Sequence, residues 1–475
     1  MRTFHVRFPE HVLGLPEPSL GTSALTASPA PLLKGTAPTA LAATAQPAHT
    51  NEWDTVFAIR FSDVNAALQK PDTHPAKFVT SVEGASAIGD FGAWQVSGGS
   101  GVLLHMKVPI TMGTTIYEGK HYPMDGAVAT IEVRLKFLPQ PSQGNGTPND
   151  LTVRTTAVGD DKVVAVTDFE VSPDPGAIVT AVMGVLLEQW LNDNLQQFHH
   201  VFSTVDLGMR ADMEQFAWLK PTSVSYGVHG SDDNPKDSIF GVLCMTEKRI
   251  APDNHDISPE AIPSGARSGF LISGERFLEK LIMPGLPSIF PKATLDDFEI
   301  TNDGTQIRNK KTLAMNDVDI AGISHTPTIA PNNCTVSLDV TEVVFKLQQV
   351  HVEFSPGIDI YMYYTGYSSI ELVTQSDGKK ALNYLKSREP VVDHSVDVAS
   401  WVVWTEVAAS VAAAVVTLGV GAWAKKVIES VALRAVATVI TLLVTGLIAN
   451  IGGILQAIAA GEKDKLPSVD LVMTN

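Results

Sequence analysis

Three segments of the 475-residue chain place glycine, serine or lysine at spacings close to those of catalytic motifs. Gly113–Lys120, GTTIYEGK, resembles a phosphate-binding loop, but its glycines lie one residue too far apart and His121 replaces the hydroxyl that would contact magnesium. The segments GASAIG and GYSSI lack the nucleophile-elbow spacing, because Ile88 and Ile370 occupy the position of the second glycine. We therefore expect a strand-to-strand turn at the first segment, no serine nucleophile, and a protein that is not an enzyme.

The candidate metal ligands do not match a known type of site. His199 and His200 are adjacent, so their side chains point in different directions, and no HExxH pattern pairs two imidazoles. The acidic segment Ser231–Asp237 lacks the turn glycine and the terminal glutamate of a calcium loop, which favours an exposed hairpin tip. Two cysteines, Cys244 and Cys334, cannot form a disulfide framework or a zinc site, and we expect buried free thiols. The sequence thus predicts no metal and no cofactor.

The net charge of the chain disfavours two classes of binding partner. The chain has 34 Lys and Arg against 51 Asp and Glu, a net charge of −17. This sign disfavours nucleic acid as a partner and electrostatic adsorption to an anionic membrane. Any contact with lipid must therefore be hydrophobic or site-specific. Because the N-terminal residues lack the apolar core of a secretory signal, we expect cytoplasmic synthesis without a signal peptide, and extracellular release by another route remains an option.

The elements that would position functional residues are long strands and a few long helices, a pattern typical of the α+β class. Residues 1–50, rich in Ala, Pro, Thr and Ser, predict a flexible leader. Apolar residues at every second position predict strands over residues 102–110, 128–139, 335–347 and 350–354. Apolar residues three and four apart predict one helix from Ala177 to about Phe202, which at about 1.5 Å per residue would span about 40 Å.

The C-terminal part of the chain contains an apolar block over residues 401–460. Two runs without charge, residues 407–424 and 435–460, are each long enough to span a membrane. Polar and glycine residues in the second run reduce its tendency to insert. The block is therefore either a membrane-inserting helical hairpin or a pair of helices that are apolar all round because a curved sheet encloses them.

Four segments, read in order, resemble one family closely: the accessory proteins of about 47 kDa encoded beside OrfX-type clostridial neurotoxin genes, with their bacterial relatives. Their residues are Trp53–Val56, Gly92–Val96 with the glycine turn that follows, Trp218–Thr222 with Ser225 and Tyr226, and Phe270–Gly274 with Phe277 and Leu278. The ordered resemblance runs from about Asn51 to Tyr364. Trp218–Thr222, WLKPT, is the most specific segment, and its own role is expected to be a structural turn with Trp218 buried.

The resemblance implies a TULIP-like fold, in which strongly curved antiparallel sheets wrap around long helices. It also implies two modules, over residues 51–330 and 331–475, the second including the apolar block 401–460. For function, it implies a non-catalytic protein that binds lipid or another hydrophobic ligand, contacts other toxin-cluster proteins and acts as an accessory component of a toxin gene cluster. Alternatives are a membrane-inserting protein that uses the 401–460 hairpin and a purely scaffolding protein without a ligand.

A lipid-binding tube would need an apolar groove between the strand at residues 128–139 and the long helix. The candidate lining residues are the inward-facing apolar side chains of these two elements, namely Ile131, Val133, Leu135, Phe137, Val182, Met183, Leu186 and Trp190. The alternative is that these side chains only contact each other and form a closed core.

Overall fold

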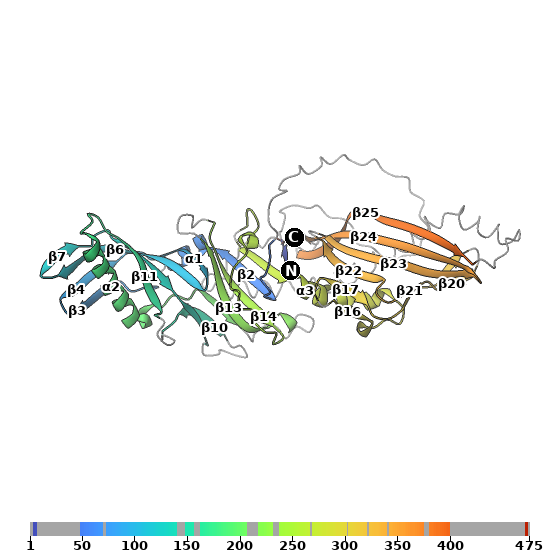
Figure 1. The fold of residues 1–475 in the computed structure, drawn as a ribbon, viewed down its shortest axis with the longest axis horizontal. Coiled ribbons are helices and arrows are strands. Elements are labelled where there is room, and N and C mark those ends of the chain that lie inside the picture. Colours follow the sequence, from blue (N-terminus) through green and yellow to red (C-terminus); the bar gives the residue numbers. More distant parts are fainter. Residues whose placement is uncertain are drawn as a thin grey trace, which may run out of the picture.

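The computed structural model describes most of the chain between residues 48 and 399, together with two short segments near its ends. The described residues are 3–6, 48–69, 73–139, 148–155, 162–206, 217–230, 237–266, 268–301, 303–320, 323–339, 342–374, 380–399 and 471–473. The predicted apolar block 401–460 and most of the predicted leader lie outside them. The described part is built mostly of antiparallel strands with few helices, and its two largest sheets lie one after the other along the long axis of the molecule (Figure 1).

The larger sheet has 13 strands and curves against the helix α2 (Figure 1). Its main order is β11-β8-β6-β5-β13-β14-β2-β15-β1-β26, and β3, β4 and β7 join it through β6. The bounds are β1 Thr3–Val6, β2 Thr55–Arg60, β3 Lys77–Val82, β4 Ala85–Phe91, β5 Gln95–Gly101, β6 Leu103–Tyr117, β7 Lys120–Pro123, β8 Val128–Val133, β11 Val164–Glu170, β13 Pro221–Gly230, β14 Ile239–Thr246, β15 Ser268–Ser273 and β26 Leu471–Met473.

Strand β6 confirms the prediction made from its two-residue periodicity. Leu104, Met106, Val108 and Ile110 are buried, whereas the residues between them are partly exposed. The strand ends in a two-residue hairpin loop to β7, in which Glu118 and Gly119 both have positive φ angles of 50° and 73°. This is the backbone that tight hairpins favour, so the GTTIYEGK segment is a strand and turn, as predicted.

The predicted strand over residues 128–139 is instead two strands in different sheets. It breaks at Arg134 into β8 and β9 (Leu135–Pro139), and β9 forms a three-stranded sheet with β10 (Pro148–Val153) and β12 (Ser203–Asp206). The backbone N–H of Leu135 donates to the Tyr226 hydroxyl at 2.9 Å, and that hydroxyl donates to the Val102 carbonyl at 2.6 Å. The phenol therefore takes the place of a strand partner where the chain changes sheet.

The helix α2 (Ala177–Asp193) is shorter than predicted. It ends nine residues before Phe202, and at about 1.5 Å per residue its 17 residues span about 26 Å. Asn194 leaves the helical conformation, and its side-chain amide donates to the Trp190 carbonyl at 2.8 Å. Because this amide satisfies a carbonyl at the helix end, the helix stops before the last third of the predicted span.

The other described helical segments are short. They are α1 Phe61–Leu68, α3 Gly274–Arg276, a π-helical turn at Phe277–Ile282, and 3-10 turns at Leu195–Gln197, Ala217–Leu219, Pro259–Ala261, Met283–Ile289 and Leu295–Asp297. None of the helices in the described ranges is long and apolar enough to cross a membrane. The expected set of long helices is therefore limited, in this part of the chain, to α2.

The second large sheet has eight strands, ordered β16-β17-β22-β23-β21-β18, with β24 and β25 added beyond β23. The predicted strand 335–347 is wrong, because the chain reverses after Asp339, which lies opposite Glu342 in the antiparallel pair. The predicted module boundary at residue 330 cuts this sheet. The bounds are β16 Phe298–Ile300, β17 Gln306–Asn309, β18 Leu313–Ala314, β21 Thr328–Ile329, β22 Cys334–Asp339, β23 Glu342–Ser355, β24 Ile358–Thr374 and β25 Lys380–Val398, beside a separate pair, β19 Val318–Ile320 and β20 Ile323–His325.

Two short strands near the chain ends form the end of the larger sheet that lies next to the eight-stranded sheet. Strand β1 pairs with β15 and with β26, and β26 contacts β24 of the eight-stranded sheet. Thr3–Val6, at the start of the segment predicted as a flexible leader, therefore forms a strand of the larger sheet.

Candidate functional site

The eight predicted lining residues come together in one hydrophobic core beneath α2. Ile131, Val133, Leu135, Met183, Leu186 and Trp190 are buried in it, and Phe137 and Val182 are partly buried and pack against it. The side chains from β8, β9 and α2 thus share one interior, although the chain changes sheet between Val133 and Leu135.

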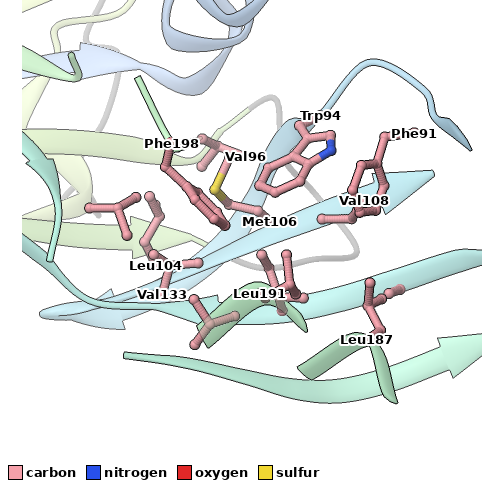
Figure 2. Close-up of a cluster of buried hydrophobic side chains, with 14 of the residues drawn as sticks. Phe91, Trp94, Val96, Leu104, Met106, Val108, Val133, Leu187, Leu191 and Phe198 are labelled. Atoms are coloured by element: carbon pink, nitrogen blue, oxygen red, sulfur yellow. The ribbon is translucent and has the colours of Figure 1, made fainter. Parts of the chain in front are cut away.

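Aromatic rings that sequence reasoning missed fill one end of this core. The Trp190 ring lies 5.5 Å from Phe91 and 6.1 Å from Phe78, between ring centroids, and Trp94 lies 5.1 Å from Phe198. Figure 2 shows Trp94 and Phe198 in the same cluster as Leu187 and Leu191 of α2. No regular two-residue period could have identified Phe78 and Phe91, because Val79 and Ile88 place apolar side chains on the exposed face of the same strands. In this conformation, side chains occupy the region that a ligand would enter.

Polar side chains of α2 hold it against the outer edge of β11, the last strand of the main path. Asn192 Oδ1 accepts from the N–H groups of Val163 and Val164, at 3.2 Å each, and its Nδ2 donates to the Val164 carbonyl at 2.7 Å. Glu188 Oε2 accepts from the Val166 N–H at 2.9 Å. Because an open strand edge exposes unpaired backbone groups, these contacts both fix the helix and close the edge.

The outer face of α2 is also apolar. Ile178 is 71% exposed and Val185 is 63% exposed, and the small Ala181 between them is exposed as well. A helix that is apolar on all sides is usually enclosed by other elements. Ile178 and Val185 are the exposed large hydrophobic residues that the α-helices of the described ranges carry, and they lie on the side of α2 away from the candidate interior.

A second cluster, made of buried charges, joins the ends of β2, β14 and β15. Asp54 and Arg276 are 1% and 2% exposed, and Asp54 Oδ1 lies 3.4 Å from Arg249 Nε and 3.9 Å from Arg276 Nε. Thr246 connects the two, because its N–H and Oγ1 donate to Asp54 Oδ2 at 2.8 and 2.7 Å while Arg276 Nη2 donates to its Oγ1 at 3.0 Å. Glu247 and Glu279 also pair with Arg276.

Three of the four segments that carry the family resemblance meet at this charge cluster. Asp54 comes from the first, Trp218 from the third, and Ser273 from the fourth, where the Ser273 N–H donates to the Asp54 carbonyl at 2.9 Å. The Arg276 guanidinium lies 5.4 Å from the Trp218 ring centroid, and Trp218 is buried, as predicted. These motifs therefore build a structural junction between distant parts of the chain.

The remaining candidate residues show no catalytic arrangement in the part of the chain that the structure describes. Those residues contain no group of three or more His, Cys, Asp or Glu that could hold a metal ion. His199 bonds with the Gln196 carbonyl, and His200 packs edge-on against Phe202. Most of the acidic segment Ser231–Asp237 lies outside the described residues.

The two cysteines are free, as predicted, but only Cys334 is buried, whereas Cys244 is partly exposed. Burial raises the pKa of the Cys244 thiol to about 12, with nearby Asp54 adding to the effect. Burial also raises the pKa of Cys334. Because the thiolate is the reactive form, neither cysteine is suited to act as a nucleophile at neutral pH.

A comparison with models of known protein families identifies the family of this chain. Residues 50–475 match the model of the OrfX-like family, described as Protein OrfX2/OrfX3/P47. The chain belongs to the OrfX-like family. This confirms the resemblance inferred from the four motif segments, and the match extends through the C-terminal apolar block.

Comparisons with individual proteins also support membership of the OrfX-like family. The chain is 28% identical to Protein OrfX3 of Paraclostridium bifermentans over 403 residues, which are 76% of this chain and 81% of that protein. It is 30% identical to Protein OrfX3 of Clostridium botulinum over 317 residues, which are 59% of this chain and 65% of that protein. In fold, it is similar to the structure of P47 from Clostridium botulinum A2, with a TM-score of 0.59 and 18% identity, over 81% of this chain and 88% of that one.

Proposed function

We propose that this OrfX-like chain is a non-catalytic TULIP protein that binds lipid or another hydrophobic ligand beneath α2 and acts as an accessory component of a toxin gene cluster. One observation carries the ligand part: α2 is apolar on both faces, with Leu186 and Trp190 in the core and Ile178 and Val185 exposed. The accessory role, with other toxin-cluster proteins as partners, rests on the family. Cytoplasmic synthesis followed by release remains part of this proposal.

Ligand uptake at this site requires α2 to move away from the sheet. The aromatic and aliphatic side chains beneath it fill the interior, and Asn192 and Glu188 fasten the helix to β11. An acyl chain leaving water gains about 0.8 kcal/mol per methylene, but one leaving a bilayer gains little. Transfer from a membrane would therefore depend on contacts that become available as α2 opens.

A reversible covalent lock on α2 tests this proposal. A Cβ placed on Gly184 would lie 3.6 Å from Val166 Cγ1, so the double variant Gly184→Cys/Val166→Cys brings two thiols within reach of a disulfide between α2 and β11. Vesicles of fluorescently labelled phosphatidylcholine serve as the donor, and mass spectrometry confirms the oxidised state. We expect the oxidised protein to take up no lipid and the reduced protein to take it up.

The same protein under two redox conditions is its own control. The native thiols of Cys244 and Cys334 do not compete for the lock, because burial raises the pKa of both and keeps them protonated. Equal uptake by the two forms would place the ligand elsewhere and refute a site beneath α2. An unmodified protein that takes up no labelled lipid and carries none after purification would refute the ligand part altogether. The scaffolding alternative would then stand.

We also propose that the chain forms two modules, with a boundary that differs from the predicted one at residue 330. Strands β16, β17, β18 and β21 belong to the same sheet as β22 to β25, so a boundary before Phe298 separates the two large sheets better than residue 330. Separate expression of residues 48–297 tests it, because an independent module should unfold in one cooperative transition.

The second candidate function is membrane insertion through the 401–460 hairpin. Its support is the length of the two uncharged runs in the sequence. If the hairpin inserts, its deletion should abolish leakage of liposomes while leaving a soluble protein. If deletion instead aggregates the chain, the block is part of a core.

A further inference from the structure

A polar groove of about 610 Å³ lies on one face of the eight-stranded sheet. Its floor follows a row of directly opposed residues across five strands, because Gln306 lies opposite Ser337, Ser337 opposite Val344, Val344 opposite Tyr367, and Tyr367 opposite Arg388. The register shifts next to Tyr367 on both sides. Such irregularities increase the local twist of a strand, which suits the formation of a hollow on an otherwise flat face.

Arg388 forms one wall of the groove and is held in place by two contacts. Its guanidinium carbon lies 3.4 Å from the centroid of the Tyr367 ring, and its Nη2 lies 3.0 Å from Glu342 Oε2. A guanidinium has five N–H donors, so a single carboxylate partner does not use all of them. Arg388 is therefore a pre-oriented donor at the edge of the groove.

The loop between β16 and β17 forms the opposite wall. Asp303 accepts from Thr301 Oγ1 at 2.5 Å and from the Thr305 N–H at 3.2 Å, and Gly304 completes the turn with a φ angle of 69°. The hydrogen bond from Thr301 is the main reason that the pKa of Asp303 lies below its ordinary value. This wall thus presents an ionised acceptor facing the donors on the other side.

The composition of the lining selects the class of ligand. Only two of its eleven residues, Leu338 and Val344, are aliphatic, which disfavours a lipid chain. The carboxylates of Asp303 and Asp339 balance the cations of Lys346 and Arg388, which disfavours an anion such as a phosphate. What remains is a ligand that is neutral and offers many donors and acceptors at once.

We propose that this groove binds a neutral oligosaccharide. Each sugar hydroxyl both donates and accepts, so it can pair with the carboxylate, amide, hydroxyl and cationic groups of the lining together. The groove falls in the usual volume range of ligand sites, about 300–1,000 Å³. Its floor crosses five strands that lie about 4.8 Å apart, so more than one ring fits along the row from Gln306 to Arg388. This site is separate from the interior beneath α2.

Saturation-transfer NMR on the full-length protein tests the proposal with maltotriose, chitotriose and lactose as probes. We expect transfer to the ring protons of at least one probe and an affinity at least about tenfold lower in Gln306→Ala and in Arg388→Ala, because each removes a donor to the sugar. Arg388 is largely exposed, so its loss should leave the fold intact. Gln348→Ala, an exposed position on β23 outside the groove, is the matched control and should bind normally.

Three results would overturn the proposal. The first is the absence of transfer to all three probes at millimolar concentration. The second is transfer that persists unchanged in both groove variants, which would place the sugar elsewhere. The third comes from competition with phosphate. Inorganic phosphate is the competing probe, and its displacement of a bound sugar at equal concentration would show a site selective for anions instead.

Discussion

At the residue scale, Asp54 and Arg276 are the two buried charges at the junction of the family motifs. Asp54 also pairs with Arg249, and Arg276 also pairs with Glu247 and Glu279. Removing either residue therefore breaks several contacts of a buried charge network and leaves its neighbours only partly compensated, which typically costs about 3–5 kcal/mol. We therefore expect Asp54→Asn and Arg276→Met each to lower the free energy of unfolding by about that amount, measured by urea denaturation.

The control for this pair is Lys77→Met. Lys77 lies 3.3 Å from Asp90 but is 73% exposed, and exposed pairs contribute about 0–1 kcal/mol. If Arg276→Met lowered the free energy of unfolding by as little as Lys77→Met, the charges would not stabilise the junction. The packing of Trp218 would then have to account for its stability.

The two thiols give a second test at this scale. Because burial keeps both cysteines protonated, we expect reaction with a thiol reagent at pH 7.5 to be at least about a hundredfold slower in the folded protein than in urea. Rapid labelling of one thiol in the folded protein would contradict this expectation. It would show that the structure around that thiol opens frequently and exposes it to the reagent.

At the element scale, Gly184 provides a test of how α2 is packed. Glycine inside a helix costs about 0.5–1 kcal/mol relative to alanine, and the added Cβ would meet Val166 at an ordinary contact distance of 3.6 Å. We expect Gly184→Ala to raise the free energy of unfolding by about 0.5–1 kcal/mol, measured by urea denaturation.

Gly89 on β4 is the matched glycine with the opposite expectation. A Cβ there would lie 2.7 Å from the Phe78 ring and 2.9 Å from the Met112 carbonyl, so Gly89→Ala should destabilise the protein. Destabilisation by Gly184→Ala would mean that α2 lies closer to β11 than these contacts imply.

The elements also mark where sequence reasoning succeeds. Strand β6 was predictable because one of its faces is buried over eight residues, which imposes a strict period of two. The end of α2 was not, because the apolar spacing continues to Phe198, whereas the backbone leaves the helical conformation at Asn194, whose side chain donates to the Trp190 carbonyl. The break at Arg134 depends on Tyr226, 91 residues away from Leu135, and no local pattern encodes it.

The candidate lining residues beneath α2 could be predicted as a group, because buried side chains recur with the period of their strand or helix. The polar groove on the eight-stranded sheet could not be predicted, because it depends on how distant strands are aligned.

At the scale of the whole molecule, two opposing effects set the response to acid. Near pH 5.2 the net charge vanishes, so self-repulsion between the 17 excess negative charges disappears. Against this, the fold depends on ionised carboxylates. Hydrogen bonds from Lys311 hold the pKa of Asp297 at about 2, and although burial by itself raises the pKa of Glu247, hydrogen bonds from Lys280 and Arg276 lower it overall.

The sign of the acid response follows from these lowered values. A carboxylate whose pKa is lower in the folded than in the unfolded chain stabilises the fold fully above its unfolded pKa, about 4, and loses that effect as the pH falls through the folded value. We expect the urea midpoint to be flat or slightly higher from pH 7 to pH 5 and to fall steadily below about pH 4. The measurement uses micromolar protein, so that the protein does not precipitate near its isoelectric point. Glu247→Gln and Asp297→Asn should each flatten the decline, and a midpoint that rises between pH 4 and pH 3 would mean that relief of repulsion outweighs the carboxylate contacts.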